Sequence, residues 1–291
     1  MRIFEPHIHM FSRTTDDYER MALAGIEGVL EPAFWLGQPR TSAGSFKDYF
    51  DTLLGWERFR ASQFGIRHYC TMALNPKEAN DERVAAEVVA LVRDYVTREG
   101  VVGVGEVGFD DMTASEERWF RAQLEIAADH ALPVLVHSSH RDKKGSVARS
   151  LSLAQETGVP PERLLIDHNN EETIPLVKEV EGAWAGFSIY PNTKMTPERM
   201  VEIFRRWGTD RMLINSAADW GVSDPLLVPK TVLAMRKAGM DEEEIQKVVW
   251  ENPIRFFAQS GKIDFADFEG RGGIDRTQVH ERNSVLRGQA P

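Results

Sequence analysis

Six histidine, glutamate and aspartate residues of this 291-residue chain could bind transition-metal ions together, because each ends or follows a short apolar run. His7 and His9 form an H-x-H pair near the start of the chain. In an extended segment, residues two apart point to the same side, so both imidazoles can face one ion. The other four stand in GVGEVGFD, PVLVHSS, LLIDHNN and MLINSAAD, where they are Glu106, His137, His168 and Asp219.

One histidine or carboxylate at the end of a strand is ordinary, because such residues usually form hydrogen bonds or cap the next helix. Four imidazoles and two carboxylates buried together would be costly unless bound cations compensated them. Nitrogen and oxygen ligands without thiolate suit zinc, manganese, iron or nickel better than calcium or magnesium. The residues therefore predict a centre of two divalent metal ions, with zinc as the first expectation.

The elements that must position these ligands follow from the alternation of short β-rich runs with longer amphipathic segments, which is typical of βαβ units. We predict strands over 2–4, 28–31, 67–73, 101–106, 133–137, 164–167, 183–188 and 211–214. Eight such units predict an α/β fold, a (β/α)8 TIM barrel, although an open doubly wound sheet gives the same local pattern. In a barrel, all six ligands would project at the C-terminal rim, where active sites of this fold lie.

The chain length fits one barrel domain, which we place at residues 1–266. Residues 14–65 are longer than a usual βα unit. We expect them to form an elaborated segment after the first strand, as an insertion or a lid over the barrel mouth. Residues 267–291 are polar and rich in glycine and arginine, so we expect a flexible or arm-like C-terminal tail.

The composition favours some classes of binding partner over others. The 35 basic and 45 acidic residues give a net charge of −10, which repels a nucleic-acid backbone and favours a small-molecule substrate. No membrane association is expected, because no apolar run approaches the roughly 20 residues that cross a bilayer and no signal peptide is apparent. The single Cys70 excludes an intrachain disulfide and fits a reducing cytoplasm. These patterns do not indicate an oligomeric state.

The ordered ligand set resembles the amidohydrolase superfamily and, within it, the TatD-type metal-dependent hydrolases, over roughly residues 2–258. The family pattern H-x-H, then G-E-x-G-[LF]-D, is matched by HIH at 7–9 and GEVGFD at 105–110, and NPIRFF at 252–257 resembles its closing N-x-x-R-x-F helix. The resemblance implies one ion held by His7, His9 and Asp219, a second held by His137 and His168, and Glu106 bridging both.

From these ligands we predict a binuclear metal-dependent hydrolase in which a metal-bridging hydroxide attacks an ester, lactone, amide or phosphoester bond. Asp219 is the expected general base and general acid. Three alternatives remain open. They are a TatD-like deoxyribonuclease acting as a 3'–5' exonuclease, a mononuclear decarboxylase of the amidohydrolase type, and a non-catalytic metal-binding module.

The substrate side departs from DNA-degrading members of the family. The usual H-x-F-S-G becomes HNNEE after the sixth strand, and E-T-D-[AS]-P becomes SAADW before the last ligand. His140 and Arg141 lie in a basic cluster beside His137, where Arg141 is suited to clamp a phosphate or carboxylate. Lys194, Trp35 and Trp220 are further candidates for lining the substrate pocket, and ordinary packing explains the two tryptophans equally well.

Overall fold

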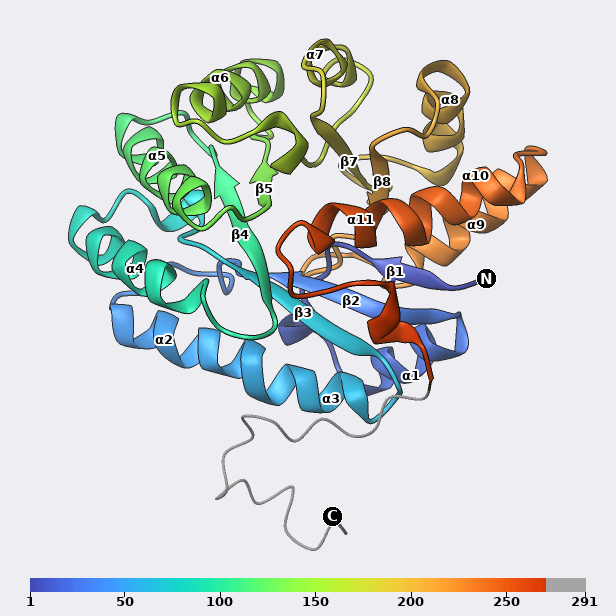
Figure 1. The fold of residues 1–291 in the computed structure, drawn as a ribbon, viewed down its shortest axis with the longest axis horizontal. Helices are drawn as coiled ribbons and strands as arrows, with labels where there is room; N and C mark the ends of the chain where they lie inside the picture. The colour runs from blue at the N-terminus through green and yellow to red at the C-terminus, as the bar shows by residue number, and fades with distance from the viewer. Residues whose placement is uncertain (271–291) are drawn as a thin grey trace, which may run out of the picture.

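The computed structural model describes residues 1–270 (Figure 1). Within this range, eight parallel strands form one sheet in the sequential order β1 to β8. Every predicted strand is confirmed, with ends within two residues of those expected. The strands are β1 (Ile3–Glu5), β2 (Ile26–Pro32), β3 (Arg67–Met72), β4 (Val101–Gly108), β5 (Val134–His137), β6 (Leu164–Ile166), β7 (Trp184–Ser188) and β8 (Met212–Asn215).

Helices pack around the outside of the sheet (Figure 1). The helix α4 illustrates why they form: it buries a valine stripe at helical spacing, and the Asp81 side chain caps its first turn by accepting a bond from the Val84 amide. None of the helices in residues 1–270 is long and apolar enough to span a bilayer. The α-helices are α1 (Thr15–Leu23), α2 (Ala43–Thr52), α3 (Arg58–Ser62), α4 (Glu82–Tyr95), α5 (Ala114–Asp129), α6 (Lys143–Glu156), α7 (Ile174–Glu179), α8 (Pro197–Trp207), α9 (Leu227–Lys237), α10 (Glu242–Gln246) and α11 (Asn252–Ala258).

The first and last strands meet at a seam just beyond their C-terminal ends. The Ala217 amide donates to the His7 carbonyl at 2.9 Å, and the His9 amide donates to the Ala218 carbonyl at 2.9 Å. The buried Glu5 carboxylate accepts the Ser216 amide at 3.1 Å. These bonds join the two ends of a sequentially ordered sheet, so the TIM barrel is confirmed. The doubly wound alternative is wrong, because such a sheet reverses its strand order.

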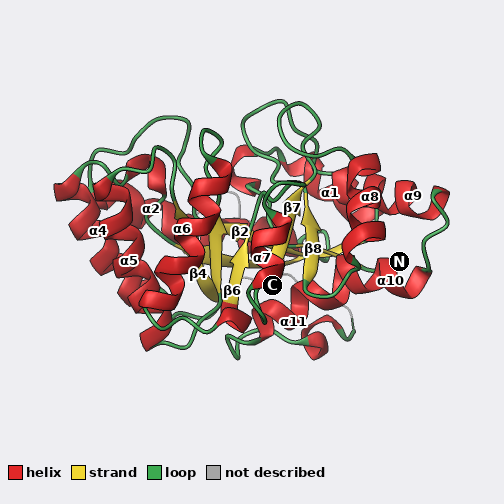
Figure 2. Cartoon of the chain, turned by 90° about the horizontal axis from the view of Figure 1, so that it is seen from above, coloured by secondary structure: helices red, strands yellow, loops and turns green. Residues whose placement is uncertain are grey.

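The opposite end of the barrel is filled by a group of buried apolar residues, here called the bottom cluster. Each strand contributes one side chain to it, and the rest come from the segment around α11, which lies across this end of the barrel (Figure 2). Its members are Phe4, Leu30, Tyr69, Val102, Leu135, Leu165, Trp184, Leu213, Trp250, Ile254, Phe256, Phe257, Ile263 and Phe268.

The structure refines the expected form of two segments, residues 14–65 and the start of the C-terminal tail. Residues 14–65 contain α1, β2, α2 and α3, which are regular parts of the first two repeats, and the irregular stretch is limited to residues 33–42. Phe268, at the start of the predicted tail, is buried in the bottom cluster, so packed structure extends past residue 266. The remainder of that tail, 271–291, lies outside the described residues. Cys70 is buried in β3.

Candidate metal centre

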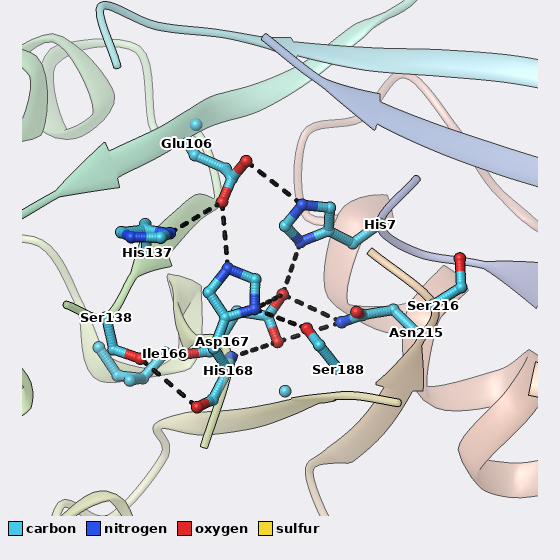
Figure 3. A network of polar contacts seen from close by, with 12 residues as sticks. His7, Glu106, His137, Ser138, Ile166, Asp167, His168, Ser188, Asn215 and Ser216 are labelled. Atoms are coloured by element: carbon cyan, nitrogen blue, oxygen red, sulfur yellow. Dashed lines mark hydrogen bonds and ion pairs between the residues drawn. The ribbon is translucent and has the colours of Figure 1, made fainter. Parts of the chain in front are cut away.

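Glu106, at the C-terminal end of β4, lies between two pairs of histidines. Its Oε1 atom is 3.3 Å from His7 Nε2 and 3.4 Å from His9 Nε2. Its Oε2 atom is 3.3 Å from His137 Nδ1 and 3.3 Å from His168 Nε2. All five residues are buried. The structure thus brings the four predicted histidines and the predicted bridging carboxylate together, with one carboxylate oxygen for each pair. Figure 3 shows the contacts of Glu106 with His7, His137 and His168.

Glycines next to Glu106 permit this close approach. A Cβ atom on Gly105 would lie 2.7 Å from the Leu135 Cβ of β5, so a side chain there would push the two strands apart. Gly108 has φ +141°, and a Cβ on it would lie 2.2 Å from the His137 carbonyl oxygen. The glycines of the GVGEVG segment therefore let β4 and β5 place Glu106 beside His137.

Asp219 follows β8 and lines the same cavity as the histidines. Its Oδ1 atom accepts the Gly221 amide at 2.8 Å and the Tyr190 hydroxyl at 3.2 Å. A Cβ on Gly221 would lie 2.2 Å from the Tyr190 oxygen, so glycine at 221 allows this contact. Tyr190 lies in the loop between β7 and α8, and no pattern in the sequence links it to Asp219.

A second carboxylate, Asp167, was not recognised from the sequence as part of the centre. It is fully buried at the end of β6, and its Oδ2 atom lies 2.6 Å from His7 Nδ1. It also accepts the His168 amide at 2.7 Å and the Asn215 side-chain amide at 3.0 and 3.1 Å (Figure 3). A carboxylate behind a histidine fixes the ring orientation and tautomer of a metal ligand. The signal for it is a carboxylate directly before a ligand histidine in an apolar strand.

Burial and charge compete at the centre. Burial by itself lowers the pKa of His7, but the carboxylates of Glu106 and Asp167 outweigh it and raise that pKa to about 10. Burial raises the pKa of Glu106, yet His7 and hydrogen bonds from His137 and His168 hold it well below its usual range. For His9, burial and the neighbouring His7 lower the pKa to about 4. A proton on His7 thus supplies positive charge that a metal ion would replace, since metal binding displaces ligand protons.

Three buried polar atoms of the predicted ligands have no hydrogen-bond partner within residues 1–270: Glu106 Oε1, His137 Nε2 and His9 Nδ1. Such atoms are costly to leave unsatisfied. Ligand atoms of His7, Glu106 and His168 all lie within 4.8 Å of one another. The orphaned atoms, the spacing and the mixture of imidazole and carboxylate all fit a centre that holds metal ions.

The cavity above the centre has a volume of about 230 Å³. Three of the predicted substrate residues line it, namely Trp35, His140 and Lys194. Lys77 lines it too, pairing with Asp110 at 2.8 Å and lying 5.5 Å from the centre of the Trp35 ring.

The other two predicted substrate residues do not line the cavity. The Arg141 side chain is 78% exposed and forms an ion pair with Asp111. Trp220 is 46% exposed, and its ring centre lies 6.1 Å from that of Phe11. Spacing along the chain placed both residues near the correct rim, but their side chains point elsewhere.

Comparisons with known proteins identify the family of the chain. The chain matches the family model described as TatD related DNase over residues 7–258. It is 26% identical over 258 residues to an uncharacterized metal-dependent hydrolase of Methanocaldococcus jannaschii, covering 88% of this chain and 99% of the relative.

Solved structures share the fold. A TatD-like protein from Archaeoglobus fulgidus has a TM-score of 0.72 at 22% identity, covering 87% of this chain and 99% of the other. A mutant organophosphorus hydrolase from Deinococcus radiodurans has a TM-score of 0.64 at 17% identity, covering 88% and 92%. The family match includes all six predicted ligands, and the chain therefore belongs to the TatD-related DNase family and is a metal-dependent hydrolase.

Proposed function

We propose that the centre binds two divalent ions, with zinc as the expected metal, and that Glu106 is shared between them. His7, His9 and Asp219 would hold one ion, and His137 and His168 the other. The observation that carries this proposal is the division of the Glu106 carboxylate, whose two oxygens each lie 3.3–3.4 Å from nitrogens of a different histidine pair. A mononuclear centre of the decarboxylase type would not need a carboxylate in this central position.

Hydrolysis of an ester, lactone, amide or phosphoester bond is the proposed reaction. When bound, two such ions would lower the pKa of a shared water toward about 7 and polarise the bond under attack. Asp219 is the proposed base: it lines the cavity and would take the proton of the attacking water and return it to the leaving group. The Tyr190 hydroxyl and the Gly221 amide both donate to Asp219 Oδ1 and so hold the carboxylate in one orientation.

A small molecule is the proposed substrate. The cavity volume of about 230 Å³ and the net charge of −10 favour it over a polynucleotide, and Arg141 is already paired with Asp111 at the rim. Deoxyribonuclease activity is the second candidate, because the matched family is the TatD-related DNases.

Metal analysis of the purified protein tests the binuclear centre. We expect two ions per chain, measured by elemental mass spectrometry after loading with zinc and removal of free metal. About one tightly held ion per chain, unchanged in Glu106→Gln, would contradict the bridged pair.

A substrate panel tests the reaction. We expect the zinc-loaded protein to hydrolyse members of a set of lactones, carboxyl esters and phosphoesters, and Asp219→Asn to lose about 10²- to 10⁴-fold in turnover while keeping its fold. Shortening of single-stranded DNA from the 3' end at a higher kcat/KM than any small ester would replace the small-molecule proposal with the nuclease. Unimpaired turnover in Asp219→Asn would refute its role as base.

A further inference from the structure

The cavity carries cationic side chains that the proposed hydrolysis does not use. Lys77 projects into it from the segment after β3, and Lys194 from the loop between β7 and α8. Lys143 lies nearby, and burial, Lys194, His137, Lys143 and Lys77 together lower the pKa of His140 to about 4. These lysines place cationic groups in or beside the cavity, although the whole sequence carries a net charge of −10.

The three lysines differ in what already satisfies them. Lys77 is neutralised by Asp110, with 2.8 Å between Nζ and Oδ1. The Lys143 ammonium donates to the Ser138 hydroxyl at 3.0 Å and to the His168 carbonyl at 2.9 Å. Within residues 1–270, Lys194 forms no ion pair, and its Nζ contacts only His168 Nδ1 in a polar interaction, at 3.3 Å.

That single contact is incompatible with the ligand role of His168. If His168 binds a metal through Nε2, the atom that faces Glu106, its ring proton must be on Nδ1. Nδ1 then donates to the Ser188 hydroxyl, 2.6 Å away, and cannot accept from an ammonium. With metal bound, Lys194 would therefore have no acceptor in the part of the chain that the structure describes.

The loop around Lys194 keeps its ammonium at the cavity. The Lys194 amide donates to the Tyr190 carbonyl at 2.8 Å, and the Lys194 carbonyl accepts from Arg199 at 2.8 Å. Its Nζ lies 5.5 Å from the centre of the Tyr190 ring. Burial lowers the pKa of Lys194, and the carboxylates of Glu106, Asp167 and Asp219 raise it at longer range. An anion beside Nζ in the cavity would stabilise the ammonium against the cost of burial.

We infer that Lys194 binds an oxyanion of the substrate, so that the substrate is a small anionic ester: a phosphoester, or a carboxyl ester or lactone that bears a carboxylate. This inference rests on the proposed hydrolase function and narrows it, because neutral phosphotriesters and unsubstituted lactones lack the group that Lys194 binds. Lys194 is a specificity-determining residue under this assignment, and Asp219 and the metal ligands perform the bond cleavage.

The test compares matched substrates with the zinc-loaded full chain. 4-Nitrophenyl phosphate places the oxyanion at the reacting centre, and 4-nitrophenyl hemisuccinate places a carboxylate away from the reacting carbonyl. Neutral 4-nitrophenyl butyrate reacts at a similar carbonyl without the charge. We expect Lys194→Met to lower kcat/KM for at least one anionic substrate by about 10- to 100-fold, which is the effect of losing one hydrogen bond to a charged group. The kcat/KM for the butyrate should change by less than about 3-fold.

Two further variants keep the result interpretable. Lys194→Arg retains the charge and should keep the preference for the anionic substrate. Arg141→Gln removes a cation from the exposed rim outside the cavity, so kcat/KM for the anionic and the neutral substrates should each change by less than about 2-fold. Equal losses for the anionic and neutral substrates in Lys194→Met, or higher wild-type efficiency with the butyrate than with both anions, would overturn the inference.

Binding of inorganic phosphate, measured by titration calorimetry on the zinc-loaded protein, separates this inference from the proposed function. Phosphate that binds the wild type and binds Lys194→Met at least about 10-fold more weakly supports the oxyanion site even if no ester is hydrolysed. Equal phosphate affinity in the two proteins overturns the site, and hydrolysis of neutral esters alone would then leave the proposed function standing without it.

Discussion

At the N-terminal end of the barrel, each strand contributes one apolar side chain to the bottom cluster, and at the opposite end several of the same strands lead into histidines and carboxylates. The bottom cluster is satisfied by packing: Trp184, Phe256 and Phe257 lie in aromatic contact with ring centres 4.9 to 5.4 Å apart. The candidate metal centre, by contrast, contains buried polar atoms that have no hydrogen-bond partner among residues 1–270. One end of the barrel therefore stabilises the fold, and the other end holds buried polar atoms that a ligand could satisfy.

This difference predicts that variants at the two ends separate activity from stability. The largest effect is expected for Glu106→Gln. Loss of the shared carboxylate should remove metal from both positions and lower kcat/KM by at least about 10³-fold, a larger loss than for residues behind the ligands. The melting temperature of the metal-free protein should change little. Metal content, steady-state kinetics and thermal unfolding measure these quantities.

Glu31→Gln is the matched control, because Glu31 is a buried glutamate on β2 that bonds to His68 and the Phe11 amide outside the ligand set. It should retain both ions. A Glu106→Gln protein that also retains both ions would break the contrast between the two ends.

Phe256→Ala in the bottom cluster should produce the opposite result. Removing this buried ring is expected to lower the free energy of unfolding by about 3–5 kcal/mol through lost burial and a cavity. Activity per folded molecule should stay within about 2-fold of the wild type, since the ring lies at the end of the barrel away from the centre. Denaturant unfolding and active-site-normalised kinetics test this. Leu233→Ala, on an exposed part of α9, should cost less than about 0.5 kcal/mol.

Asp167→Asn should have an intermediate effect on the centre. The amide cannot supply the negative charge that stabilises His7, so metal affinity or turnover should fall by about 10- to 100-fold. Zinc competition with a chelating dye measures the affinity. Asp111→Asn, which alters an exposed carboxylate paired with Arg141, should leave the affinity unchanged. Wild-type zinc affinity and turnover in Asp167→Asn would show that His7 needs no carboxylate behind it.

Tyr190→Phe should have the smallest effect. It removes one of two donors to Asp219 Oδ1, and a single hydrogen bond of about 0.5–1.5 kcal/mol corresponds to a decrease in kcat of about 2- to 10-fold. KM and metal content should not change, because the hydroxyl orients the base without binding an ion. A rise in KM with kcat preserved would assign Tyr190 to substrate binding instead.

The sequence predicted the strands, and it predicted that the six candidate ligands would meet at one rim, where they line one cavity. Both depend on short-range patterns, because apolar runs mark the strands and parallel strands place their C-terminal ends at one rim. It did not predict Asp167 or Tyr190, because their roles depend on contacts between distant repeats. Asp167 meets His7 across 160 positions in the chain. Arg141 and Trp220 were expected in the pocket from proximity in sequence alone, but loop geometry turns both side chains to solvent.

The seam between β1 and β8 has a consequence for how the protein is made. His7 and His9 are bonded through their backbones to Ala217 and Ala218, immediately before Asp219, so this side of the centre unites the earliest and nearly the latest parts of the barrel. During synthesis, which proceeds from the N-terminus, the two histidines leave the ribosome long before Asp219, the third residue of their proposed set. A long loop must therefore close before this site exists, and such non-local closure is slow. We therefore expect this site to bind metal only at the end of folding. A chain whose translation is arrested before residue 219 should bind metal incompletely at this site.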